Sequence, residues 1–191
     1  MTRSPDDIRC ELLVVRCRRQ DAEAWKELVG LFQDRLYYFV RRMVSDDDAA
    51  AVVMQEVWMQ VLRGLGQLHT SDRLTPWLYT IARRMAVNRY RRESVEPASA
   101  GETLADVSEE DHEAFEQFEN AELVHFGLSR LAVDDREILT LHFLEEFSVA
   151  EVARILEIPE GTVKSRLFKA RSELRRVLDR ESIQRPKGVR S

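Results

Sequence analysis

Residues Ser148 to Arg176 read SVAEVARILEIPEGTVKSRLFKARSELRR and carry the clearest fold signal of the chain. Its first part repeats apolar residues at the spacing of one helix face, at Val149, Val152, Ala153 and Leu156. Ser148, followed three residues later by Glu151, predicts a capping box at the start of this helix. Pro159 is expected to stop the helix and to prepare the next one. Two helices joined by a tight turn are therefore predicted.

The second helix of this pair has one apolar stripe and one basic face. The stripe follows a 4-3-4-3 spacing, at Val163, Leu167, Ala170, Leu174 and Val177 or Leu178. Four residues near the helix start are expected to point away from it: Lys164, Ser165, Phe168 and Lys169. In helix-turn-helix proteins this end of the second helix enters the major groove of DNA. Residues 160–180 hold seven Lys or Arg against three Asp or Glu, in a chain of net charge -5. Such local positive charge favours a DNA-binding surface over an ordinary solvated face.

The composition is typical of an all-α protein with one ordinary domain or two small ones. The chain has 191 residues, 7 Gly, 5 Pro and 8% aromatic residues. Cys10 and Cys17 are its two cysteines, and their helical spacing predicts core residues in a reduced, cytosolic protein. The sequence contains no apolar run of about 20 residues and no signal-peptide pattern, so no membrane span is expected. We find no metal-binding spacing and no phosphate loop, and expect no metal, no cofactor and no enzymatic activity.

The chain divides into segments of different character. Helical periodicity is nearly continuous from about Ile8 to Glu93, with turns predicted at residues 19–21, 45–48 and 64–75. Residues 95–119 contain nine acids and no Lys or Arg, which is typical of a solvated, flexible linker. We therefore predict an all-α fold of two small helical domains joined by a flexible acidic linker, the C-terminal one containing the helix-turn-helix. The expected boundaries are 1–94, 95–119, 120–181 and a flexible tail at 182–191.

A second basic segment lies at residues 73–92, which contain six Arg and no acid. Its apolar residues predict a buried helix face made of Trp77, Leu78, Ile81, Ala82, Met85 and Ala86. Arginine and aromatic side chains together are what a site for single-stranded nucleic acid uses. The alternative is that Trp77, Tyr79 and Tyr90 are ordinary core and rim aromatics, and both interpretations remain open.

Three segments in this order resemble the extracytoplasmic-function (ECF) sigma factors of bacterial RNA polymerase. They are DAAAVVMQEVWMQVLRGL (48–65), TPWLYTIARRMAVNRYRR (75–92) and LAVDDREILTLHFLEEFSVAEVARILEIPEGTVKSRLFKARSELR (131–175). The resemblance implies a core-binding helix, a helix that engages the -10 promoter element, and a module that reads the -35 element. It implies a factor that directs transcription initiation. The alternative is a stand-alone helix-turn-helix regulator.

The resemblance also implies site residues. For the -35 element they are Lys164, Ser165, Arg166, Phe168 and Lys169, with Arg166 either reading a base or clamping a phosphate. For the -10 element they are Trp77, Arg83, Arg84, Asn88 and Arg91, together with a base-binding loop at residues 66–75. For core polymerase they are Gln55, Glu56 and Trp58, together with Gln60.

The partners implied are core polymerase, through its clamp coiled coil and flap, promoter DNA and an anti-sigma factor. The implied location is the cytoplasm, with nucleoid association when the chain is bound to polymerase. The sequence departs from the family pattern at three places. Ala49–Met54 replace the usual acids, Arg84 replaces an amide, and Glu157 stands at a turn position where Gly is common. The turn at Glu157 is therefore expected to be either slightly strained or differently shaped.

Overall fold

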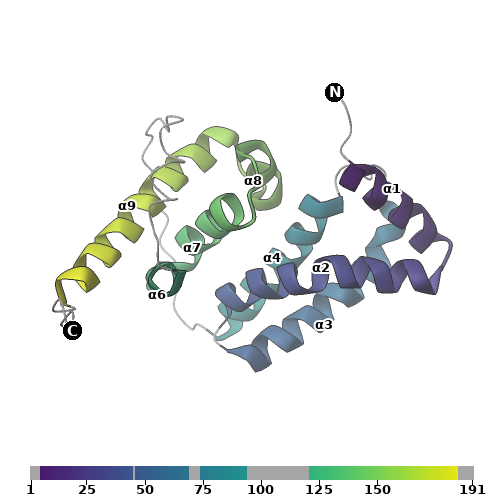
Figure 1. Cartoon of the computed structure of the whole chain (residues 1–191), viewed down its shortest axis with the longest axis horizontal. Helices are drawn as coiled ribbons and strands as arrows, with labels where there is room; N and C mark the ends of the chain where they lie inside the picture. Colours follow the sequence, from purple (N-terminus) through teal and green to yellow (C-terminus); the bar gives the residue numbers. More distant parts are fainter. Residues whose placement is uncertain (1–4, 45, 69–73, 94–120, 185–191) are drawn as a thin grey trace, which may run out of the picture. The chain divides into compact units, whose positions relative to one another are not determined.

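The computed structural model describes residues 5–44, 46–68, 74–93 and 121–184, and the chain divides at Pro97 into two compact units (Figure 1). Every regular element among these residues is a helix. This confirms the all-α prediction with two helical units. The predicted linker at residues 95–119 and most of the predicted tail lie outside the described residues.

The first unit contains α1 (Pro5–Arg18), α2 (Ala22–Met43), α3 (Asp47–Gly64), the short 3-10 turn η1 (Leu65–Gln67) and α4 (Leu74–Glu93). Helix α2 packs against α1, α3 and α4, and α3 also packs against α4. Figure 1 shows α2 and α3 lying side by side along most of their length. The predicted turn at residues 19–21 is confirmed, since α1 ends at Arg18 and α2 begins at Ala22. Helices α3 and α4 each begin two residues earlier than the turns predicted at 45–48 and 64–75 indicated. Residues 45 and 69–73 of these two turns lie outside the described residues.

Side-chain caps explain where α2 and α3 begin. Gln20 adopts a left-handed conformation with φ of 62°, and Asp21 then accepts hydrogen bonds from the backbone N–H groups of Glu23 and Ala24. Asp46 accepts a 2.7 Å bond from the N–H of Ala49 in the same way. Each cap satisfies helix donors that have no partner inside the helix.

The buried face of α4 is rotated from the predicted stripe. Leu78, Ala82 and Ala86 are fully buried as predicted, whereas Trp77 and two other members of the stripe are partly exposed. Tyr79 takes the central place instead, with its ring 5.4 Å from the ring of Phe39 at an interplanar angle of 63°. The reason is that α4 packs against two helices, α2 and α3, and so buries a wider arc than one stripe.

The second unit contains α6 (Ala121–Ser129), α7 (Val133–Leu139), the π-helical turn η4 (Thr140–Leu144), α8 (Val149–Leu156) and α9 (Glu160–Gln184). Helices α6 and α7 pack on α9. Gly127 allows a close approach of α6, because a Cβ there would lie 2.6 Å from Cδ1 of Leu174 and 2.8 Å from Cδ2 of Leu178. The long helix α9 is therefore the helix on which α6 and α7 pack.

The helix-turn-helix has the predicted start but a different stop. The capping box is confirmed: the Ser148 hydroxyl accepts from the N–H of Glu151, whose carboxylate accepts from the N–H of Ser148. Pro159 does not stop α8, which ends three residues earlier at Leu156. Glu157 turns the chain with φ of 58°, and the N–H of Ile158 bonds to the carbonyl of Ala153. Glu157 thus holds the left-handed backbone conformation that glycine adopts most easily.

The core of the pair follows the predicted α9 stripe. Its buried residues are Val163, Leu167, Ala170, Leu174 and Leu178. In α8 the sequence analysis missed Ile155, which is fully buried, while Val149 is partly exposed.

Two further predictions concern cysteines and membrane spans. Cys17 is buried in α1, and burial raises the pKa of its thiol, whereas Cys10 is partly exposed; neither forms a disulfide within the part of the chain that the structure describes. The prediction that both cysteines are core residues is therefore confirmed for Cys17, whereas Cys10 is only partly buried. Among the described helices, none is long and apolar enough to cross a membrane.

Candidate nucleic-acid and polymerase interfaces

The first candidate surface, here called the α9 face, consists of Lys164, Ser165, Arg166, Phe168 and Lys169 in the first turns of α9. The three cations are exposed, and Phe168 exposes 46% of its surface. Ser165 is partly buried, and its hydroxyl donates to the carbonyl of Thr162. The adjacent Val163 and Leu167 are 0% and 1% exposed, so their packing fixes the direction of the whole face.

The structure adds an acidic neighbour to the α9 face that sequence reasoning missed. Asp135, in the first turn of α7, lies near enough to Lys169 and Arg166 to interact electrostatically with both. Burial raises the pKa of the Asp135 carboxyl, and the positive charge of Lys169 opposes this shift. No spacing in the sequence links α7 to α9, and the contact arises because the two helices pack together.

The second surface, here called the α4 face, consists of Trp77, Arg83, Arg84, Asn88 and Arg91. Arg84, Asn88 and Arg91 are exposed and follow one another at spacings of four and three, so they share one side of α4. Arg83 is partly buried on the neighbouring side. Cationic and amide groups therefore line about two turns of helix, which suits a nucleic-acid backbone.

The aromatic residues of α4 divide between the core and its rim. Tyr79 is a core residue, as the ordinary-aromatic alternative held. The Trp77 ring packs over Gly64 at the end of α3, where an added Cβ would lie 2.9 Å from Cζ2. Tyr90 is 38% exposed. Half of the predicted base-binding loop, residues 69–73, lies outside the described residues.

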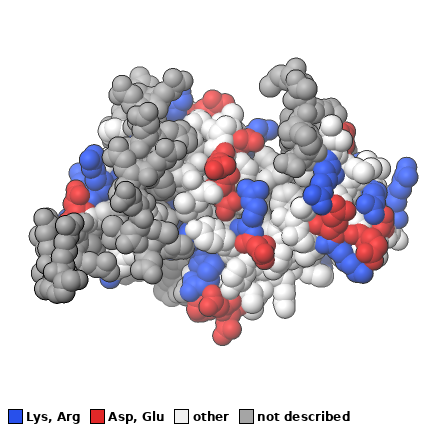
Figure 2. Space-filling view, in the orientation of Figure 1, with Lys and Arg blue, Asp and Glu red and all other residues white. Residues whose placement is uncertain are grey.

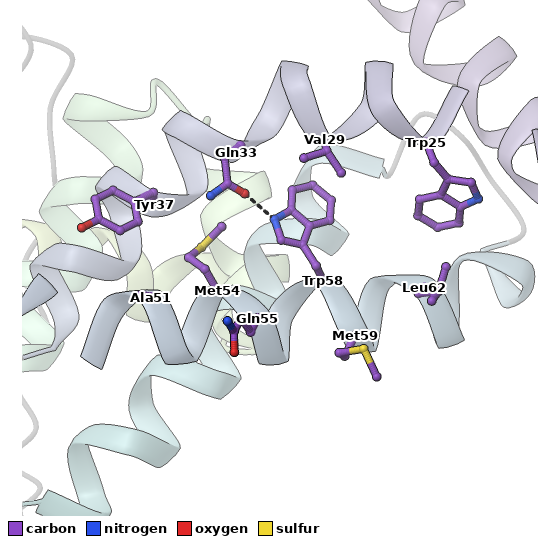
Figure 3. A pocket seen from close by; sticks show the side chains of 10 residues that line it. All are labelled: Trp25, Val29, Gln33, Tyr37, Ala51, Met54, Gln55, Trp58, Met59 and Leu62. Carbon is purple, nitrogen blue, oxygen red and sulfur yellow. Dashed lines mark hydrogen bonds between the residues drawn. The ribbon is translucent and has the colours of Figure 1, made fainter. Parts of the chain in front are cut away.

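The third surface, here called the α3 face, consists of Gln55, Glu56 and Trp58. Gln55 and Glu56 are exposed, and Trp58 is partly buried. The structure separates the Gln-Glu pair: Gln55 and Trp58 line an open groove of about 690 Å³ between α2 and α3, and Glu56 does not. Figure 3 shows that the opposite wall comes from α2, with Trp25, Val29, Gln33 and Tyr37.

Sequence reasoning missed these four α2 residues. They recur every four residues along one side of α2, and this spacing is the sequence signal that could have identified them. Charged side chains gather at the two ends of this part of the first unit. Ion pairs such as Arg9 with Glu27 and Lys26 with Glu23 lie at the α1–α2 end, and the acidic start of α3 pairs with Arg41. Figure 2 shows an uncharged area between charged groups on this unit.

Comparison with known proteins finds a family match in each of the two units. Residues 28–95 match the family model for Sigma-70 region 2, and residues 122–174 match the model for Sigma-70, region 4. The RNA polymerase sigma-H factor of Pseudomonas aeruginosa is 32% identical over 178 residues, covering 87% of this chain and 92% of that protein. The ECF RNA polymerase sigma factor SigM of Mycobacterium tuberculosis is 30% identical over 158 residues, covering 83% and 79%.

Solved structures support the fold. CnrH, in complex with the cytosolic domain of CnrY, superposes with a TM-score of 0.66 at 19% identity, covering 89% of this chain and 97% of that chain. The sigma factor RpoE of Bartonella quintana, in complex with the anti-sigma factor NepR, gives a TM-score of 0.63 at 23% identity, covering 83% and 98%.

Two helical units with region 2 and region 4 matches define a transcription initiation factor. The chain belongs to the ECF sigma factors of bacterial RNA polymerase. It is therefore a factor that directs transcription initiation and not an enzyme.

Proposed function

We propose that this sigma factor docks on core polymerase through the α3 face, reads the -10 element with the α4 face and reads the -35 element with the α9 face. In this proposal region 2 spans 1–94, the acidic linker 95–119, region 4 120–181 and a tail 182–191. The observation that carries it is the α9 face, where exposed cations and an exposed aromatic ring alternate with fully buried Val163 and Leu167. Cations clustered on one helix face of an otherwise acidic chain form the electrostatic footprint of a polyanion-binding surface.

On the α9 face, Lys164, Arg166 and Lys169 contact phosphates or guanine edges in the major groove. Phe168 contacts a thymine methyl group or a sugar, and Ser165 adds a short polar contact. An aromatic ring that is 46% exposed loses contact with water when it meets such a group, which favours binding. The face supplies selection of the upstream element and a share of the affinity.

On the α4 face, Arg83, Arg84, Asn88 and Arg91 hold the backbone of the non-template strand. Trp77 and the loop at residues 66–75 contribute to recognition of an unpaired base. A surface that binds only the open strand lowers the free energy of melting, because it stabilises the open state alone.

Core polymerase holds the α4 face and the α9 face in place for simultaneous binding to the promoter. The chain alone binds a promoter weakly, because ordering two linked units on DNA costs conformational and rotational freedom. Docking through Gln55, Glu56 and Trp58 holds the units at the spacing of the two promoter elements. The factor acts in the cytoplasm, and is nucleoid-associated when bound to polymerase.

The solved relatives CnrH and RpoE are each bound to a protein partner, and NepR is named an anti-sigma factor. By analogy, we propose that an anti-sigma factor binds this chain too. Such a partner covers the α3 or α9 face and competes with polymerase or promoter DNA.

In vitro transcription tests the proposal. Purified core polymerase is given fragmented genomic DNA of the source bacterium, with and without this chain, and transcript 5′ ends are sequenced. We expect new 5′ ends that share two sequence blocks upstream, one near -10 and one near -35. If the chain adds no promoter-dependent transcript, the proposal is wrong.

The stand-alone regulator remains the second candidate, because the second unit holds a complete helix-turn-helix. That candidate predicts site-specific binding to duplex DNA without polymerase. A gel-shift selection with the full chain, run with and without core, separates the two: a regulator selects one sequence either way, and a sigma factor requires core.

A further inference from the structure

The groove between α2 and α3 has one large rigid side chain at its middle. In Figure 3 Tyr37 and Trp25 lie at its two ends, and Trp58 rises between them from α3 toward α2. Met59 and Leu62 on α3 also line it and are 49% and 57% exposed. Trp58 therefore forms the largest part of the groove that belongs to the α3 face.

One hydrogen bond crosses the groove and fixes this ring. Nε1 of Trp58 donates to Oε1 of Gln33 over 2.5 Å, and both side chains are partly buried. The bond joins residues 25 positions apart, on α3 and α2. An indole carries one donor and no acceptor, so the amide oxygen of Gln33 is the atom that must face it.

The bond has a consequence for the shape of the groove. A Trp side chain turns about two torsions, and a partly buried indole N–H needs a hydrogen-bond partner. Gln33 supplies that partner from the opposite wall, so one ring orientation is favoured before any partner binds. A partner that meets a fixed ring does not have to order it, and this raises affinity.

We propose that Gln33 is a positioning residue of the core-docking surface: its amide oxygen holds the Trp58 indole in the orientation that core polymerase binds. The inference rests on the proposed function, in which Gln55, Glu56 and Trp58 dock on core. It extends that surface to α2, whose residues face Gln55 and Trp58 across the groove. Gln33 itself acts through Trp58.

The test measures the affinity of the full chain for core polymerase, by competition against a fluorescently labelled copy of wild type. Gln33→Met keeps the length of the side chain but removes the acceptor, and we expect affinity to fall about 3- to 10-fold. Gln33→Glu keeps an acceptor oxygen and is expected to bind within about 2-fold of wild type. A purely structural role would not distinguish these variants by the presence of an acceptor.

A double-mutant cycle isolates the bond. Trp58→Phe removes the donor, so adding Gln33→Met to it should cause no further loss of affinity. Lys26→Met is the matched control, because Lys26 lies on α2, exposes 74% of its side chain and does not line the groove. It is expected to bind as wild type does.

Unfolding followed by tryptophan fluorescence shows whether each variant still folds as wild type does. All three Trp residues, Trp25, Trp58 and Trp77, lie in the first unit, so their emission reports its folding. Equal binding by Gln33→Met and wild type overturns the inference and leaves the proposed function intact. A full additional loss in the Trp58→Phe background also overturns it. If wild type itself fails to bind core, the proposed function is wrong.

Discussion

The indole ring of Trp77 on α4 lies directly over Gly64 at the end of α3, so close that a methyl group on Gly64 would lie 2.9 Å from Cζ2 of the ring. A distance below about 3.0 Å cannot be kept, so one of the two groups would have to move. The contact joins the two helices that flank the predicted base-binding loop. It explains why glycine stands at the last position of α3.

Replacing Gly64 with Ala should therefore destabilise the first unit. We expect the free energy of unfolding to fall by about 1 to 3 kcal/mol, as for other overpacked sites. Tryptophan fluorescence during thermal unfolding measures it, since all three Trp residues lie in this unit. Gly30→Ala is the matched control: it lies in α2 with nothing within 4 Å of the new Cβ, and should stabilise the unit slightly. Equal midpoints for the two variants would contradict the contact.

Substitutions at two adjacent residues of α9 should affect different properties, one the stability of the second unit and the other DNA binding. Leu167 is 1% exposed, and Leu167→Ala should cost about 2 to 5 kcal/mol of stability because it leaves a cavity. Phe168 is 46% exposed, and Phe168→Ala should change stability by less than about 0.5 kcal/mol while weakening promoter binding by holoenzyme. Far-UV circular dichroism and promoter-binding titrations measure the two effects. A large loss of stability in Phe168→Ala would show that its ring is part of the core.

Lys164 should contribute a phosphate contact. Lys164→Ala should lower the slope of log affinity against log salt by about 0.9, for holoenzyme on its promoter. If Lys164 reads a base instead, the slope stays and one base preference relaxes. Lys26→Ala on α2 is the control for loss of one exposed lysine. An unchanged slope together with an unchanged base preference would exclude Lys164 from the interface.

Replacing Glu157, whose backbone is left-handed, with Gly should raise the stability of the second unit. Its φ of 58° is unfavourable for a residue with a Cβ, so Glu157→Gly should raise the stability of the second unit by about 1 kcal/mol. Glu157→Ala keeps the Cβ and should show no such gain. Thermal unfolding of the full chain, followed by circular dichroism, compares them. Equal stability of the Gly and Ala variants would mean that the turn carries no strain.

Asp135 should make stability depend on pH. Burial raises its pKa in the folded state above the ordinary value of 3.8, so the folded state binds the proton more strongly than the unfolded state does. Stability from this group is therefore present below pH 3.8 and is lost as pH rises through the raised folded pKa. Asp135→Asn should be more stable than wild type at neutral pH, and the difference should shrink in acid.

The same substitution should strengthen DNA binding. Asn removes a negative charge that lies near Lys169 and Arg166, so holoenzyme should bind its promoter more tightly at low salt. Asp134→Asn is the matched control, since Asp134 is exposed in the same first turn of α7. Denaturant titrations across pH compare the stabilities of the two variants. If the stability of Asp134→Asn depends on pH as that of Asp135→Asn does, the effect of Asp135 is not due to its burial.

Features that depend on a single helix could be predicted from the residue pattern alone. The period of α9 places Val163 and Leu167 inward and Lys164 and Phe168 outward whatever the partner helix is, because a helix side repeats every 3.6 residues. The Ser148 capping box is equally local, since its two hydrogen bonds join residues three apart. The resemblance to ECF sigma factors is also local, because it depends on specific residue strings, WLYTIAR at 77–83 and GTVKSRLFKAR at 161–171, and not on helix periodicity.

Tertiary packing alone decided which side chains meet across helices. It buried Tyr79 in place of Trp77, because α4 packs on α2 and α3 together. It brought Asp135 to Lys169 and Gln33 to Trp58, pairs separated by more than 20 positions in the chain. No period within a single helix encodes such pairs. They depend on which helices pack together and at what register, and that is set by the shapes of all the core side chains at once.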